Sequence, residues 1–393
     1  MNFFSGKHFV KTLFCGLIVA LFSFVAEARF QRAEIKKTVA KTEMRLAGAQ
    51  SFSAVNAQSG TIEWRVDRLE TDETSSETVL IKDVATATGT KVTFNLPKIS
   101  GKETVYQINA RGKNFELTQN VQVFEPETAS SFIFKSAGNP DVQCYIVVPK
   151  TLSPKTRIIV VMSGLNRNSD EYISSWTDWA ARHDYIAVSP TFDEKNWGGS
   201  RGYNLGNVFT EDEGKGEMNA RSKWSFTVVE GIHQKLRADF GIADARFDIF
   251  GHSAGAQFVH RLMLFNPEAK VRFALAANAG WFTLPDLNAA FSYGLKHPQL
   301  SFTKKNLLDW TRRPVILMRG TADTSRAGAL RKTPEADAQG QNRFERAAFM
   351  FNRIKAVNSK TQWRLIDVPK VGHDQKLMAL AAQDFLVKAD RKK

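Results

Sequence analysis

The chain has 393 residues, of which 43% are hydrophobic and 24% charged, a balance typical of folded globular proteins. This length suggests two domains, and 2 cysteines exclude a scaffold held together by disulfides. The net charge is +14, and the part after residue 130 carries most of it, with 38 Lys and Arg against 26 Asp and Glu. This excess predicts a solvated basic surface, with contact to an anionic surface or polymer as the alternative. We expect no nucleic-acid partner, because no basic cluster is interleaved with aromatic residues.

Residues 1–28 have the pattern of a cleaved secretory signal peptide. Lys7 and Lys11 precede an apolar run from Leu13 to Val25, and Ala26-Glu27-Ala28 has the small-x-small form of a cleavage site. The run has about thirteen residues, whereas a membrane span needs roughly 20. The pattern therefore favours a secreted or periplasmic protein over the alternative of a membrane anchor.

Removal of the signal peptide would leave Cys144 as the only cysteine. A single cysteine cannot form an internal disulfide. Because Cys144 lies within the apolar run from Val142 to Val148, we expect it in a buried strand rather than as a catalytic thiol.

Residues 29–128 are predicted to form a small β-sandwich-like domain. Short alternating runs are separated by turn residues, as expected for antiparallel strands. These runs are residues 61–66, 78–81, 91–96, 104–110 and 115–123. Residues 31–50 are charged and rich in alanine, which predicts a linker or a frayed helix. The domain is interpreted as a packing or secretion spacer, with a carbohydrate- or polymer-binding module as the alternative.

Residues 129–393 instead alternate between apolar strands and longer helical patterns. Predicted strands cover residues 131–135, 143–148, 157–162, 185–189, 246–250, 273–277, 314–318 and 362–368. Predicted helices begin at Ser169 and cover residues 222–239, 254–265, 344–357 and 375–388. Such alternation predicts an α/β domain with a mostly parallel sheet and helices on both faces.

Ser253 is the candidate nucleophile. It lies in Gly251-His252-Ser253-Ala254-Gly255, between a predicted strand and a predicted helix. A sharp strand-to-helix turn exposes a serine hydroxyl, and glycines allow the close backbone approach that the turn requires. The alternative is a tight turn with an incidental serine.

A serine nucleophile needs a histidine base and an acid that orients this base. In this type of fold both partners follow the serine along the chain, the acid first and the histidine second. His373 follows the last predicted strand, whereas His260 lies inside the nucleophile helix and His297 in a loop. Asp323 follows the strand that ends at residue 318 and would orient His373. Asp374 is adjacent to His373, which makes a hydrogen bond between the two side chains awkward.

The amides of Leu165 and Ala254 are the candidate oxyanion-hole donors. Ala254 directly follows the nucleophile, and Leu165 lies in the loop after the strand over residues 157–162. Gly164 would allow this loop to turn inward. Each such donor can lower the barrier by about 3 kcal/mol.

Together these segments resemble the α/β-hydrolase superfamily and, within it, the secreted poly(3-hydroxybutyrate) depolymerase-like and feruloyl-esterase-like group. The resemblance covers residues 130–393 and rests on Ser163–Asn168 with Tyr172, Gly251–Gly255, Gly320–Asp323 and Gly372–Asp374. It implies Ser253 as nucleophile, Asp323 as acid and His373 as base. The chain departs from the family at Ser163, where a histidine often stands.

Two long segments, residues 193–221 and 281–313, are expected to flank the active site as binding loops. Trp197, Tyr203 and Trp281 could form an aromatic wall for the substrate or could instead anchor these loops to the core. Gly164 and Asn166 are further candidate substrate-binding residues.

The sequence thus favours hydrolysis of a small-molecule or polymeric carboxylic ester through an acyl-enzyme. A serine peptidase of the same fold is the first alternative, and a catalytically inactive surface-binding protein is the second. No metal-ligand cluster, nucleotide-binding loop or redox motif occurs, so we expect no metal and no cofactor.

Overall fold

The computed structural model describes residues 42–53, 62–72, 77–100, 102–112 and 115–391. The predicted signal peptide, residues 1–28, lies outside these ranges. The chain divides into two compact units, Met1–Pro126 and Glu127–Lys393, two residues before the predicted boundary. In the described part of the chain, no helix is both long enough and apolar enough to cross a membrane.

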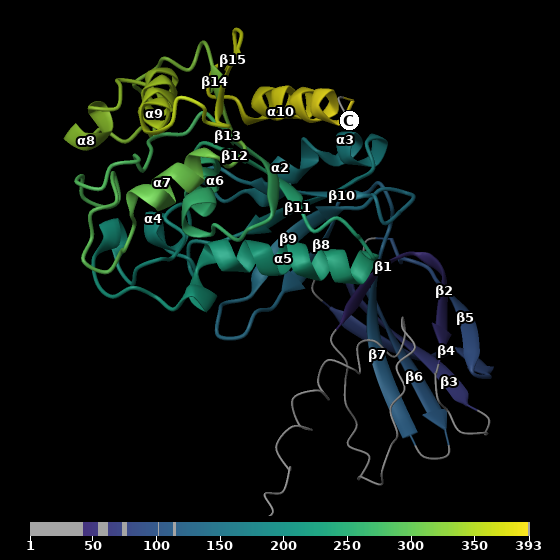
Figure 1. The fold of residues 1–393 in the computed structure, drawn as a ribbon. Coiled ribbons are helices and arrows are strands. Elements are labelled where there is room, and N and C mark those ends of the chain that lie inside the picture. The colour runs from purple at the N-terminus through teal and green to yellow at the C-terminus, as the bar shows by residue number, and fades with distance from the viewer. Residues whose placement is uncertain (1–41, 54–61, 73–76, 101, 113–114, 392–393) are drawn as a thin grey trace, which may run out of the picture. The chain divides into compact units, whose positions relative to one another are not determined.

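The first unit is built from strands (Figure 1). A five-stranded sheet has the order β1-β7-β6-β3-β4, and β2 and β5 form a separate antiparallel pair. The strands are β1 (Glu43–Leu46), β2 (Gly48–Ser53), β3 (Glu63–Asp72), β4 (Thr78–Thr88), β5 (Lys91–Leu96), β6 (Lys102–Gly112) and β7 (Phe115–Phe124). In the larger sheet only β1 and β7 pair in parallel.

The core of this unit comes from alternate residues of both sheets. Phe52 and Phe94 of the β2–β5 pair are buried with Trp64 and Ile108 of the larger sheet. This arrangement confirms the all-β prediction for the unit. The prediction of a linker or frayed helix up to residue 50 was wrong for β1 and β2, because Met44 and Phe52 are buried and draw these segments into strands.

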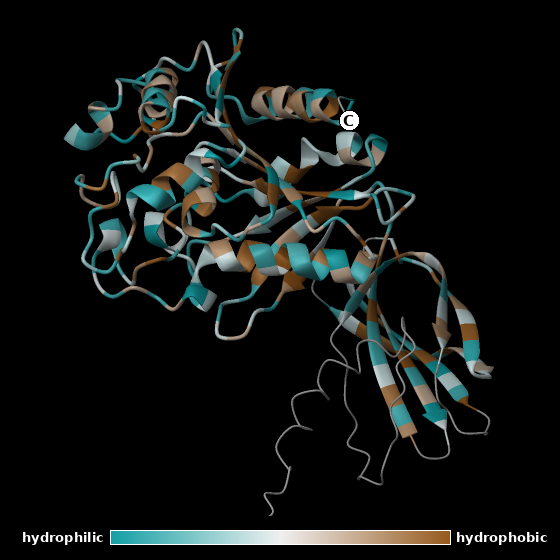
Figure 2. Cartoon of the chain, in the orientation of Figure 1, coloured by the Kyte–Doolittle hydropathy of each residue, from teal (hydrophilic) through white to brown (hydrophobic). Residues whose placement is uncertain are grey.

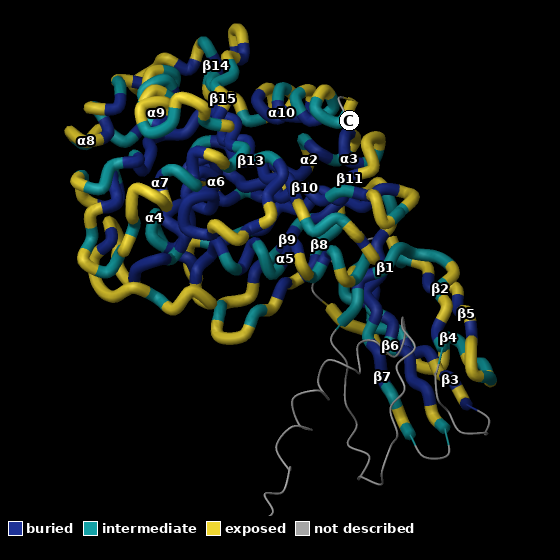
Figure 3. Tube along the Cα trace, in the orientation of Figure 1, coloured by how far each residue is buried: buried dark blue, intermediate teal, exposed yellow. Residues whose placement is uncertain are grey.

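The second unit contains an eight-stranded sheet of order β15-β14-β13-β12-β10-β11-β9-β8. Its strands are β8 (Ser130–Phe134), β9 (Val142–Val147), β10 (Arg157–Met162), β11 (Tyr185–Thr191), β12 (Phe247–His252), β13 (Val271–Ala277), β14 (Val315–Gly320) and β15 (Arg364–Val368). The pairings among β10 to β15 are parallel, and β9 is antiparallel to both neighbours. The central strands are apolar and buried (Figures 2 and 3).

Helices cover both faces of this sheet (Figure 1), which confirms the α/β prediction. They are α2 (Ser169–Ser174), α3 (Thr177–Arg182), α4 (Gly199–Gly202), α5 (Ser225–Phe240), α6 (Ala254–Phe265), α7 (Lys304–Thr311), α8 (Pro334–Asp337), α9 (Arg343–Val357) and α10 (Gln375–Asp390), with short 3-10 turns η2 (Asp212–Gly214) and η3 (Arg221–Lys223). Trp176 and Met378, from the α2–α3 region and α10, share one core cluster with Val161 and Phe250 of the sheet. Helix α5 lies on the opposite side of the sheet from α10 (Figure 1).

Candidate active site

Ser253 occupies a strained turn between β12 and α6. Its φ of 57° and ψ of −115° lie in a region that residues with side chains rarely adopt. The Ser253 amide donates to the Ala277 carbonyl at 2.9 Å. A Cβ at Gly251 would lie 2.3 Å from the Gly255 carbonyl, and one at Gly255 would lie 2.2 Å from the Met162 oxygen. Both positions therefore require glycine for the serine to be presented in this way.

The three side chains predicted to act together do lie together. His373 Nε2 is 3.1 Å from Ser253 Oγ, and His373 Nδ1 is 2.8 Å from Asp323 Oδ2. These distances suit a hydrogen bond donated by Ser253 to Nε2 and one donated by Nδ1 to the carboxylate. The Asp323 side chain is 2% exposed and that of His373 32%, so the acid is buried behind a histidine that reaches solvent.

The Asn278 side chain and a close backbone approach hold the acid and histidine loops against each other. Asn278 accepts from the Gly320 amide at 2.8 Å and donates to the Gly372 carbonyl at 2.9 Å. A Cβ at Gly320 would lie 2.3 Å from the Val371 oxygen, so only glycine permits this approach. Asp374 accepts from the Leu377 amide at 2.9 Å, which makes it the N-terminal cap of α10 rather than a partner of the neighbouring histidine.

His252 and Tyr172 support His373 from behind. The His252 and His373 ring centroids are 4.5 Å apart, and the Tyr172 hydroxyl is 3.0 Å from His252 Nδ1. The same hydroxyl accepts a hydrogen bond from the Gly164 backbone. Burial, with the charges of His373 and Arg343 adding to it, holds the pKa of His252 well below its usual value. His252 is therefore uncharged and does not repel a protonated His373.

Sequence reasoning assigned no role to either supporting residue. In the sequence, Tyr172 contributes only to the family resemblance, and His252 is only one residue of the motif around Ser253. Their function depends on a contact between Tyr172 and His252, which are 80 residues apart in the chain.

A cleft of about 120 Å³ opens at Ser253. It is lined by Leu165, Ser200, Asn204, Ser253, Ala254, Gln257, Gly280, Trp281, Ala329, Arg331 and Arg343. Ala254 is the first residue of α6, where a helix leaves its amides without internal partners. A Cβ at Gly164 would lie 3.8 Å from the Ser253 Cβ, which places the Leu165 loop directly beside the nucleophile.

Of the predicted substrate-binding residues, Gly164 lies beside the serine and Trp281 lines the cleft. The interpretation of Trp197 and Tyr203 as part of an aromatic wall was wrong, because their exposed fractions are 1% and 0%, which fits the alternative that they anchor their loops. The Tyr203 hydroxyl donates to the Ser163 carbonyl at 2.6 Å, so this ring anchors its loop to the core. Asn166 is exposed but is absent from the cleft lining.

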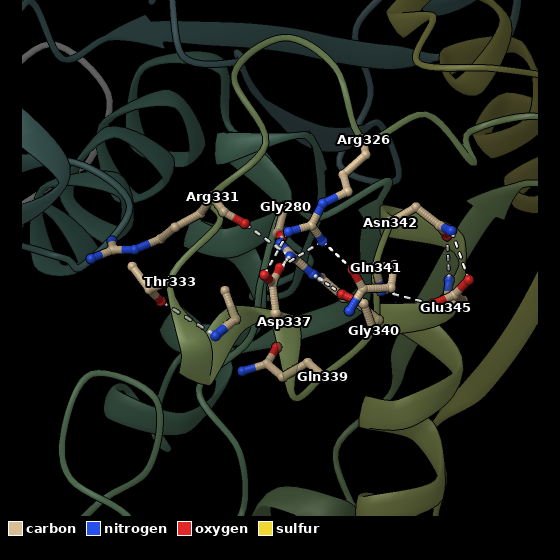
Figure 4. Close-up of polar contacts among 12 residues, drawn as sticks. Gly280, Arg326, Arg331, Thr333, Asp337, Gln339, Gly340, Gln341, Asn342 and Glu345 are labelled. Carbon is tan, nitrogen blue, oxygen red and sulfur yellow. Dashed lines mark hydrogen bonds and ion pairs between the residues drawn. The ribbon is translucent and has the colours of Figure 1, made fainter.

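The sequence also missed the two arginines of the cleft, Arg331 and Arg343. Figure 4 shows the hydrogen bonds and ion pairs around the segment that carries Arg331. Arg346 is fully buried and donates to the carbonyls of Gly280 and Arg331, which fixes two parts of the cleft wall. Because these arginines come from a polar loop and the start of a helix, their charges read as ordinary surface charges in the sequence.

Within the described residues, no group of three or more His, Cys, Asp or Glu side chains could hold a metal ion. Cys144 is buried as predicted, and burial raises the pKa of its thiol, which keeps it protonated.

A parallel sheet with a serine on a strained strand-to-helix turn, and an acid and a histidine after later strands, is the arrangement of the α/β-hydrolases. No protein-family model matches the chain, and no curated protein does. Among solved structures, the chain is similar to poly(aspartic acid) hydrolase-1 from Sphingomonas sp. KT-1, at 32% identity and a TM-score of 0.63, over 66% of this chain and 98% of that one. It is also similar to a poly(3-hydroxybutyrate) depolymerase from Bordetella parapertussis, at 28% identity and a TM-score of 0.62, over 67% of this chain and 91% of that one.

The chain therefore belongs to the α/β-hydrolase, esterase-like family, and its second unit is a hydrolase.

Proposed function

We propose that this hydrolase cleaves carboxylic esters through an acyl-enzyme formed on Ser253. The observation that carries the proposal is the continuous chain of hydrogen bonds from Ser253 through His373 to Asp323. A second support is the cleft that opens at the serine hydroxyl.

In the first half-reaction, Ser253 Oγ attacks the ester carbonyl while His373 Nε2 takes its proton. Asp323 holds His373 in the tautomer that accepts this proton and stabilises the resulting imidazolium. The amides of Leu165 and Ala254 would donate to the negatively charged oxygen of the tetrahedral intermediate. His373 then returns the proton to the departing alkoxide, and the C–O bond of the ester breaks.

In the second half-reaction, water replaces the alcohol. His373 takes a proton from the water as its oxygen attacks the acyl carbon, and the proton passes to Ser253 Oγ as the acid leaves. Tyr172 and His252 act on both halves by limiting how far the His373 ring can rotate.

A fluorophosphonate probe tests the nucleophile. We expect wild type to be labelled and Ser253→Ala to be unlabelled and inactive on p-nitrophenyl butyrate. Ser174→Ala, on the exposed face of α2, is the matched control and should label normally. Equal labelling of wild type and Ser253→Ala would refute the assignment, and absence of labelling in all three would favour an inactive surface-binding protein.

Amide hydrolysis is the second candidate, because the 32% identical relative is a poly(aspartic acid) hydrolase. The same nucleophile and base cleave both ester and amide bonds. Comparing p-nitrophenyl esters with peptide p-nitroanilides distinguishes the two. We expect ester turnover to dominate, whereas faster turnover of the anilides or of poly(aspartic acid) would establish the amide reaction instead.

We also propose that the protein is exported. The support is the pattern of residues 1–28 in the sequence, with its charged start, apolar run and small-x-small site. N-terminal sequencing of the exported protein should begin at Arg29. A chain that keeps Met1 and stays with the membrane would indicate an anchor.

A further inference from the structure

The charged side chains that line the cleft are all positive. Of the described residues that form its wall, Arg331 and Arg343 are basic and none is acidic. The Arg343 side chain is only 6% exposed, and its Nε has no partner among the described residues. Its Nη1 lies 3.6 Å from Asp323 Oδ1, which is a long contact for an ion pair. Arg343 therefore retains donors that a ligand can use.

A third arginine lies behind the wall. Arg261 is fully buried, stacks on Trp281 at 4.1 Å, and donates to the Thr283 hydroxyl at 2.8 Å and the Asn204 carbonyl at 3.0 Å. Its remaining nitrogen, Nη2, has no partner among the described residues. The groups that accept hydrogen bonds from this cation are all neutral, and its burial, with the charge of Arg331 adding to it, lowers the pKa of Arg261 well below the usual value.

Arg331 is held in position for binding. Its guanidinium lies 4.8 Å from the Trp281 ring on the cleft wall, and its backbone carbonyl accepts a hydrogen bond from Arg346. It pairs with Glu213, whose side chain is 52% exposed, so solvent weakens that ion pair. The positive charge at the cleft is thus only partly neutralised by the protein.

Burying cations without carboxylate partners destabilises a fold. Three arginines lie around one cleft, and only Asp323, in long contact, and the half-exposed Glu213 oppose their charge. A negative charge that arrives with the substrate best explains this excess. A guanidinium matches the planar geometry of a carboxylate and can bind both of its oxygens.

We propose that the cleft selects ester substrates that carry a free carboxylate, which Arg343 binds with the support of Arg331. The proposal rests on the proposed esterase function and names the substrate class of that same site. Arg343 is the specificity-determining residue, and Arg261 contributes a positive potential from behind Trp281.

Two matched pairs of esters test the proposal. The first compares the mono-p-nitrophenyl ester of adipic acid with its methyl p-nitrophenyl diester, which places the charge on the acyl side. The second compares 3-carboxy-4-nitrophenyl butyrate with its carboxamide analogue, which places the charge on the leaving group. We expect wild type to show a higher kcat/KM for the anionic member of at least one pair.

The variants are Arg343→Met, Arg343→Lys and Arg331→Met, with Arg312→Met at the exposed C-terminal cap of α7 as the matched loss of one positive charge. We expect Arg343→Met to reduce the anionic-to-neutral ratio of kcat/KM by about ten- to a hundredfold, through the loss of a charged hydrogen bond. Arg343→Lys should retain part of the preference, Arg331→Met should lower it less, and Arg312→Met should leave it unchanged.

The neutral ester in each pair separates specificity from damage to the catalytic residues. A change in Asp323 caused by Arg343→Met would slow both esters and leave their ratio unchanged, and Arg331→Met does not touch Asp323. The proposal is wrong if wild type prefers neither anionic ester or if both arginine variants keep the wild-type ratio. Neutral-ester activity that survives in Ser253→Ala would instead overturn the proposed function.

Discussion

The two ends of the eight-stranded sheet both bury arginines, but they treat the charges differently. At the amino ends of the strands, Arg272 binds Asp248, which is 1% exposed, with Nε to Oδ1 at 2.9 Å, and it also binds the Tyr185 hydroxyl at 2.6 Å. Asp390 from the end of α10 joins this cluster. Burial opposes the charge of Arg272, but the bonds to Asp248 outweigh it and raise the pKa of Arg272.

At the carboxyl ends, by contrast, Arg261 has no carboxylate partner among the described residues and Arg343 has only a long contact with Asp323. Removing one partner of a complete buried pair destabilises a fold, whereas incomplete pairing leaves a potential that a ligand can satisfy. The comparison therefore separates a structural end of the sheet from a functional end. Charge removal should affect stability at the first and activity at the second.

The largest expected effect is the loss of activity in Asp323→Asn. An amide cannot hold His373 in the required tautomer, and comparable substitutions lower kcat by about 10⁴-fold. We expect the folded protein to persist, with kcat measured on p-nitrophenyl butyrate falling to near background. Asp374→Asn, which alters only the cap of α10, is the control and should keep most of its activity. Retention of activity in Asp323→Asn would remove this residue from the mechanism.

The opposite pattern is expected for Asp248→Asn. Removing one partner from a buried ion pair leaves Arg272 partly uncompensated and should lower the free energy of unfolding by about 3 kcal/mol. Denaturant titration measures the loss, and kcat of the folded enzyme should not change. Asp244→Asn is the matched control, because its ion pair with the half-exposed Arg246 should contribute less than about 1 kcal/mol. If Asp248→Asn were to lower kcat without lowering stability, the separation of the two ends would fail.

Acid should lower the free energy of unfolding, because histidines are buried at both ends of the eight-stranded sheet. Burial, and then the charge of Arg237, lowers the pKa of His233 from 6.5 to about 4. The unfolded chain therefore binds more protons than the folded one between these values, so stability is complete above pH 6.5 and falls as the pH drops toward 4. For His233 alone the loss by pH 5 is on the order of 2 kcal/mol.

Thermal unfolding from pH 7.5 to 5 measures this effect. His233→Gln removes the titrating group and should flatten the dependence of Tm on pH, while kcat at pH 7.5 stays the same. His183→Gln, at an exposed position, is the control with a smaller expected change. An identical pH slope in wild type and His233→Gln would contradict the assignment.

The smallest expected effect belongs to Tyr172→Phe at the functional end. Loss of the hydroxyl frees His252 and, through it, the His373 ring, and we expect kcat to fall about tenfold while KM is unchanged. Tyr145→Phe on β9 is the control. A rise in KM with unchanged kcat would instead place Tyr172 in substrate binding.

The positions of Ser253, Asp323 and His373 could be predicted because each follows a strand of one parallel sheet. The carboxyl ends of such strands lie at one edge of the sheet. The order of strands and loops along the chain was therefore enough to predict that His373 and Ser253, which are 120 residues apart, lie together. The aromatic wall could not be predicted in the same way. The sequence around a tryptophan or tyrosine in a long loop does not distinguish a side chain that lines the cleft, as Trp281 does, from one that packs only into the core, as Trp197 does.

The amino-acid sequence by itself determined the two-part organisation, the class of sheet in each part and the positions of Ser253, Asp323 and His373. The spacing of apolar residues and the positions of turn residues are local properties of the chain, and the class of each sheet follows from them. Only the tertiary structure decided which charges are paired. The contrast between Arg272 and Arg261 depends on which side chains meet in the folded chain, because the free energy of a buried charge is set by its neighbours in space and not by its neighbours in sequence.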